Sequence, residues 1–138
     1  MNHSMTNTKD TIKTINAATS LLISIAYADE VLDNREISVI KEIISEFFEI
    51  EPEIAEKVYI DSSKDLENST DLFAFGKVLN NTFSYQDKLD FIGCIFEVAF
   101  IDGELHYIES HTIKSIANIL NLDNSDIIKT KMEIKRFL

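Results

Sequence analysis

Apolar residues recur along most of the chain at spacings of three and four, as in helices that bury one face. The alternation typical of β-strands is nowhere sustained, and only three glycines and one proline interrupt the chain. The first predicted helix carries four apolar residues on one face: Ile12, Ile15, Leu22 and Ile25. The whole pattern predicts seven helices, over residues 9–28, 34–48, 52–60, 70–81, 84–101, 107–120 and 123–138.

Short polar signals mark where these helices begin and where the chain turns. Ser84 with Asp87 forms an S-x-x-D capping signature before the fifth helix. Asp123 and Asp126 are expected to cap the last helix. The polar run DSSKDLENST, residues 61–70, predicts a loop. Helices joined by short connections predict an all-α fold.

The chain length of 138 residues suits one domain. The polar start predicts a disordered leader over residues 1–9, followed by a single helical domain over residues 10–138. That start lacks the apolar segment of a secretory signal. The longest apolar run, residues 91–101, contains Glu97 and is too short to cross a bilayer. We therefore expect a cytoplasmic protein without direct membrane insertion.

Composition narrows the classes of partner. About 45% of the residues are hydrophobic, enough for a buried core, and the net charge is −11. Binding to nucleic acid requires a basic face, so we expect no nucleic-acid partner. The same charge disfavours docking on anionic lipid. It leaves cations and the basic surfaces of partner proteins as candidate ligands.

The strongest signal is an internal repeat, in which residues 26–43 align with residues 99–116 after a shift of 73. A one-residue slip extends the similarity to residues 47–53 and 119–125. Chance would give about one identity over such a stretch. Seven positions are identical: Ala26/Ala99, Asp29/Asp102, Leu32/Leu105, Glu36/Glu109, Ile40/Ile113, Lys41/Lys114 and Ile43/Ile116. The repeat predicts two helix–loop–helix units, each followed by another helix, packed about a pseudo-twofold axis.

Several of these positions have a structural explanation. Ala26 and Ala99 stand near the ends of the leading helices, where a small side chain permits close approach. Leu32 and Leu105 are expected to anchor the two loops in the core. Gly103 follows Asp102 and suits a backbone conformation with positive φ.

The repeated carboxylates, Asp29, Glu36, Asp102 and Glu109, leave two interpretations open. They can cap helices and close loops by hydrogen bonding. Alternatively, the two pairs converge across the pseudo-twofold axis and bind Ca²⁺ or another divalent cation. Neither loop is an EF-hand, because the twelfth residue counted from each aspartate is an isoleucine instead of a glutamate.

Other chemistries find less support. Cys94 lies in an apolar run and is expected to be a buried thiol, not a nucleophile. Asp102, His106 and Glu109 offer a weaker alternative, a zinc or iron site. The sequence has no phosphate-binding loop and no serine or cysteine paired with a base. We therefore expect no enzymatic activity.

The segments AYADEVLDNREI, residues 26–37, and AFIDGELHYIES, residues 99–110, resemble the A-x-x-D-G-x-[IL]-x-x-x-E signature of the TerB-like domains. These are small all-helical modules, found in tellurite-resistance protein TerB and in the DjlA co-chaperones. The resemblance covers most of the chain, from about Thr11 to its end. Glu30 stands where the signature has glycine in the first copy. The chain lacks the His-Pro-Asp triplet of a J domain, so a co-chaperone role is not supported.

The resemblance implies a cytosolic, non-enzymatic module of a stress-response or envelope-associated complex, with divalent-metal binding at Asp29, Glu36, Asp102 and Glu109. The leading hypothesis is accordingly a TerB-like module that binds a divalent cation, a partner protein, or both. The alternative is a metal-free helical interaction or scaffold domain. A small metalloenzyme is the third and weakest candidate.

Overall fold

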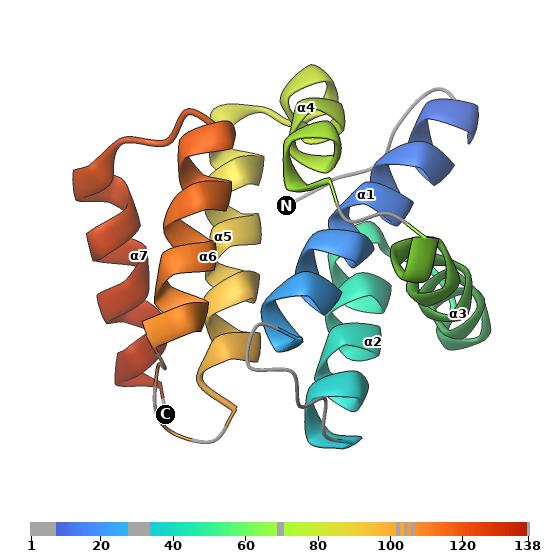
Figure 1. Cartoon of the computed structure of the whole chain (residues 1–138), viewed down its shortest axis with the longest axis horizontal. Helices are drawn as coiled ribbons and strands as arrows, with labels where there is room; N and C mark the ends of the chain where they lie inside the picture. Colours follow the sequence, from blue (N-terminus) through green and yellow to red (C-terminus); the bar gives the residue numbers. More distant parts are fainter. Residues whose placement is uncertain are drawn as a thin grey trace.

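The computed structural model describes residues 8–27, 34–68, 71–101, 103, 105 and 107–137. Seven α-helices make up most of these residues. They are α1 (Thr8–Ala26), α2 (Asn34–Phe48), α3 (Pro52–Asn68), α4 (Leu72–Thr82), α5 (Tyr85–Ala99), α6 (Tyr107–Ile119) and α7 (Asn124–Arg136) (Figure 1). No residue in these ranges belongs to a β-strand, so the predicted all-α class is confirmed. Most of the predicted leader, residues 1–7, lies outside the described residues.

The loop predicted over residues 61–70 is wrong, because α3 continues to Asn68. The polar run hides a helical spacing: Tyr59, Ser62 and Leu66 follow one another at steps of three and four. Tyr59 and Ser62 are buried and Leu66 packs against the core, whereas Lys64 and Asp65 between them are exposed. Packing of this face onto the rest of the domain therefore outweighs the polar composition that suggested a loop.

The predicted start of α5 is confirmed by its hydrogen bonds. The Ser84 side chain accepts from the Asp87 backbone N–H at 3.1 Å, and the Asp87 carboxylate accepts from the Ser84 backbone N–H at 3.1 Å. Each bond satisfies a backbone donor that a helix start otherwise leaves unpaired.

The predicted cap of α7 differs from the observed one. Asp123 occupies the N-cap position but makes no capping bond through its side chain. Instead, the Tyr85 hydroxyl accepts from the Asp123 backbone N–H at 3.1 Å and donates to the Asp126 carboxylate at 2.6 Å. The bond to the carboxylate raises the pKa of the Tyr85 phenol. One tyrosine thus ties the start of α5 to the start of α7.

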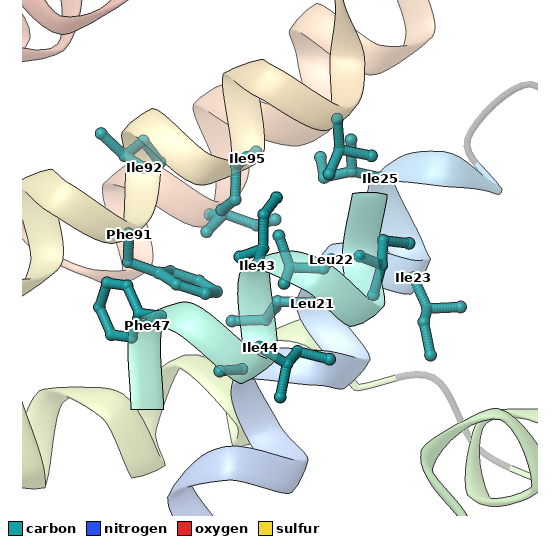
Figure 2. Close-up of a cluster of buried hydrophobic side chains, with 14 of the residues drawn as sticks. Leu21, Leu22, Ile23, Ile25, Ile43, Ile44, Phe47, Phe91, Ile92 and Ile95 are labelled. Atoms are coloured by element: carbon teal, nitrogen blue, oxygen red, sulfur yellow. The ribbon is translucent and has the colours of Figure 1, made fainter. Parts of the chain in front are cut away.

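The core lies where α1 meets its neighbours, since α1 packs against α2, α3, α4, α5 and α6. Figure 2 shows aliphatic side chains of α1, α2 and α5 in this core, including Leu21, Leu22, Ile25, Ile43, Ile44, Ile92 and Ile95. Beside them the rings of Phe47, Phe83 and Phe91 contact one another at centroid distances of 5.7 to 5.9 Å. These rings join α2 to α5 and to the connection that precedes it.

Helix boundaries follow the sequence repeat. α1 and α5 end at Ala26 and Ala99, and α2 and α6 begin at Asn34 and Tyr107, all with the shift of 73. Both alanines are buried, as expected for positions of close helix approach. α1 also packs against α6, and α2 against α5, which is the reciprocal pairing that exchange of the two units requires. The pseudo-twofold axis itself stays a prediction.

The one-residue slip also has a structural counterpart. α2 is followed by Glu49 with φ of 55°, and α6 by Asn121 with φ of 59°. Next to them, the Ile50 N–H donates to the Ser45 carbonyl at 3.0 Å, and the Leu122 N–H donates to the Ala117 carbonyl at 3.1 Å. In each of these pairs the two residue numbers differ by 72, and so do those of the first residues of α3 and α7. Residues of α3 and α7 therefore correspond with a shift of 72.

Candidate functional site

The helix ends that flank the two repeated acidic loops lie at one end of the molecule. Figure 1 shows the C-terminal ends of α1 and α5 and the N-terminal ends of α2 and α6 toward the bottom of the view. The α1–α5, α1–α6 and α2–α5 contacts hold these helices together. The fold therefore gathers at one end the elements that carry the repeated carboxylates.

Glu36 and Glu109 are each the third residue of their helix, in the first turn of α2 and of α6. The Glu36 side chain is half-buried, and Glu109 is only 4% exposed. The positive end of the helix dipole favours a carboxylate at this position. The other two predicted ligands, Asp29 and Asp102, lie outside the described residues, so the convergence of all four acids stays a prediction.

Within the described ranges, no three or more histidine, cysteine, aspartate or glutamate residues are grouped so as to hold a metal ion. Because Asp29 and Asp102 are not among them, the four-acid site is not tested by this finding. The same holds for the weaker zinc or iron set, since Asp102 and His106 also lie outside.

Two structural predictions for the second loop are confirmed. Gly103 has φ of 87°, a conformation that side chains other than glycine rarely adopt. Leu105 is half-buried and packs against the core, as expected of a residue that anchors the loop. Its counterpart Leu32 lies outside the described residues. Leu105 thus anchors the second loop to the core.

Charges on α2 act on an acidic side chain near the end of α5. Burial is the largest cause that raises the pKa of Glu97, and the charges of Glu46 and Glu42 raise it further. Burial, with Glu97 next, raises the pKa of the Cys94 thiol to about 12. Very little thiolate exists at neutral pH with such a pKa, which agrees with the prediction that Cys94 packs as an apolar side chain.

Three surface hollows differ in the charges of their walls. The one between α1 and α3, about 610 Å³, includes Glu67. The one between α5 and α7, about 480 Å³, includes Asp90, Glu97, Asp126 and Glu133 beside Lys129. The third, of about 310 Å³, is a groove between α6 and α7 with Phe96 of α5 among its lining residues. Lys114 and Lys131 are the charged residues of that lining, and the sequence interpretation did not anticipate them.

Comparison with known protein families gives one match. The family model described as "Tellurite resistance protein TerB" matches residues 16–132, well over half of the chain. Searches of the curated proteins and of the solved structures returned no significant match. The matched region includes all four repeated carboxylates and all of α2 to α6.

Proposed function

Because the chain belongs to the TerB family, we propose that it is a helical module that binds a divalent cation at Asp29, Glu36, Asp102 and Glu109. It acts on a partner protein by binding and not by catalysis. Its setting is a cytoplasmic stress-response or envelope-associated complex. No helix in the described part of the chain has both the length and the apolar composition needed to cross a membrane.

The observation that carries this proposal is the placement of Glu109. A carboxylate that is 4% exposed loses most of its hydration, and that loss must be offset by hydrogen bonds or by positive charge. Glu36 stands at the equivalent place of the other unit, and each glutamate lies in the first turn of a helix, seven residues after a repeated aspartate in the sequence. Carboxylate oxygens are the ligands that Ca²⁺ and Mg²⁺ prefer, so the donor set fits such an ion.

A metal-free interaction domain is the second candidate, and a specific observation favours it. Glu36 and Glu109 hold the third helical position, the same position from which Asp87 closes the capping box of α5. Acids at this position cap helices in the absence of any ion. In this alternative the repeated carboxylates shape the two loops, and the protein surface alone recognises the partner.

Thermal unfolding with and without Ca²⁺, Mg²⁺ or Mn²⁺ at matched ionic strength separates the two candidates. An ion that binds only the native state with a Kd of about 100 µM stabilises it by roughly 1.4 kcal/mol at about 1 mM. Since about 1 kcal/mol moves the Tm of a small domain by roughly 2–8 °C, the shift is measurable. The double variant Glu36→Gln with Glu109→Gln should lose it.

The matched control is Glu53→Gln with Glu67→Gln, which removes the same charge from two exposed positions of α3. This control should keep the ion-specific shift. If the parent shows no shift for any of the three ions, or if the control loses the shift as completely as the loop variant does, the cation site is wrong. The metal-free interaction domain is then the better account.

A further inference from the structure

The two units of the repeat differ at one lysine. In the first unit the Lys41 ammonium of α2 lies 2.6 Å from the Glu56 carboxylate of α3 and 5.1 Å from the centroid of the Tyr59 ring. The ion pair and the cation–π contact together join α2 to α3. Lys114 of α6 is the repeated counterpart of Lys41.

The second unit lacks both partners of this contact. With the shift of 72 that relates α3 to α7, Ile128 replaces Glu56 and Lys131 replaces Tyr59. Lys114, Ile128 and Lys131 all line one surface hollow, so the positions that hold a carboxylate and an aromatic ring in the first unit hold an isoleucine and a second lysine here. Within the described residues, neither Lys114 nor Lys131 makes an ion pair.

Helix packing also differs between the two units. α2 packs directly on α3, whereas α7 packs on α5 and leaves a groove between itself and α6. The groove is lined by apolar residues of three helices and of the second loop, among them Phe96, Leu105, Ile113 and Ile127. Ile128 lines it while 54% exposed, so part of this apolar lining is open to solvent.

The charge of the groove is opposite to that of the protein. The chain has a net charge of −11, yet none of the described residues that line the groove is acidic. Lys114 is exposed and Lys131 half-buried on opposite walls. An apolar floor between two lysines matches an amphipathic ligand whose carboxylates flank its apolar side chains.

We propose that the α6–α7 groove binds an acidic amphipathic helix of a partner protein. The groove wall on α7 runs from Asn124 to Lys131 in steps of three and four, which is about 10 Å of helix. A partner segment of two to three turns fits this length, with its apolar face on the groove floor. One carboxylate of the segment pairs with Lys114, as Glu56 pairs with Lys41 in the first unit.

This proposal rests on the part of the proposed function that concerns a partner protein, and it gives the chemistry of that partner. It does not depend on cation binding. Its test is a selection from a displayed library of 16-residue helical peptides against the full chain. We expect the enriched peptides to combine apolar residues with Asp or Glu. Fluorescence anisotropy then measures the Kd of one enriched peptide for the parent and for variants.

The groove variant is Lys114→Glu with Lys131→Glu, and the control is Lys57→Glu with Lys64→Glu, the same charge change at two exposed positions of α3. We expect binding to weaken by about tenfold or more in the groove variant and by less than about twofold in the control. The single variant Lys114→Gln, at an exposed position, gives the same test if the groove variant does not fold.

A second variant, Ile128→Glu with Lys131→Tyr, rebuilds within the chain the contact that the first unit has. It should weaken peptide binding at least as strongly as the groove variant, because the carboxylate then competes with the peptide for Lys114.

The proposal is overturned if no peptide is enriched, if the enriched peptides lack acidic residues, or if the groove and control variants bind alike. It is also overturned if the groove instead mediates a dimer of the chain that Lys114→Glu dissociates. Calcium melts of the same preparations report separately on the cation site.

Discussion

Gly76 and Gly93 allow the same substitution, glycine to alanine, to be made in two buried helical positions with opposite expected results. A Cβ atom added at Gly76 would overlap Cγ2 of Ile119 and lie 3.3 Å from its Cβ, so the Ile119 side chain or the two helices must shift. A Cβ atom at Gly93 would lie 3.5 Å from Thr130 and 3.6 Å from Ile134, which are ordinary contacts.

The magnitudes follow from three terms. Alanine is favoured over glycine inside a helix by about 1 kcal/mol, and this gain applies to both variants. Overpacking at Gly76 costs about 1–3 kcal/mol. Movement of α4 also strains the bond of 2.7 Å that the Asn80 amide donates to the Ile119 carbonyl, worth about 0.5–1.5 kcal/mol. We therefore expect Gly76→Ala to lose about 0.5–3.5 kcal/mol, and Gly93→Ala to gain up to about 1 kcal/mol.

Urea denaturation followed by circular dichroism measures both free energies of unfolding, and an unchanged m-value shows that the midpoints report stability alone. The two variants act as controls for each other, because the residue change and the helical context are the same. If Gly76→Ala is as stable as Gly93→Ala, the close approach of α4 to Ile119 is wrong.

Two further predictions concern titratable groups of α5. Burial and the charges of Glu46 and Glu42 raise the pKa of Glu97 in the folded state, so the native protein holds its proton more tightly than the unfolded chain does. Stability should therefore fall as pH rises through the folded pKa of Glu97, and Glu97→Gln should be more stable than the parent at pH 7 but not at pH 4. Urea midpoints at the two pH values test this, and a benefit of Glu97→Gln that is equal at both would contradict it. The pKa of about 12 for Cys94 predicts that a disulfide reagent modifies the native thiol at pH 8 far more slowly than the thiol of the urea-unfolded chain. Equal rates in the two states would show that the thiol is accessible and ionised.

Part of the candidate site could be predicted from the sequence. The repeat identified Glu36 and Glu109 as equivalent positions, and the structure places both in the first turn of a helix. Their burial could not be predicted, since it depends on how each helix start packs, and Glu109 is more buried than Glu36. The lysine-lined groove was missed as well, although the replacement of Glu56 by Ile128 under the one-residue slip was a signal that could have revealed it.

The sequence by itself predicted the seven helices of the described residues, most of their boundaries and the capping box of α5. Apolar spacing and capping are local, because they involve residues within a turn or two of one another. Only the tertiary structure decided that α3 extends through a polar run and that Lys41 is paired while Lys114 lines a groove. Those outcomes depend on which helices meet, and the energies of burial and ion pairing belong to contacts between residues far apart in the chain.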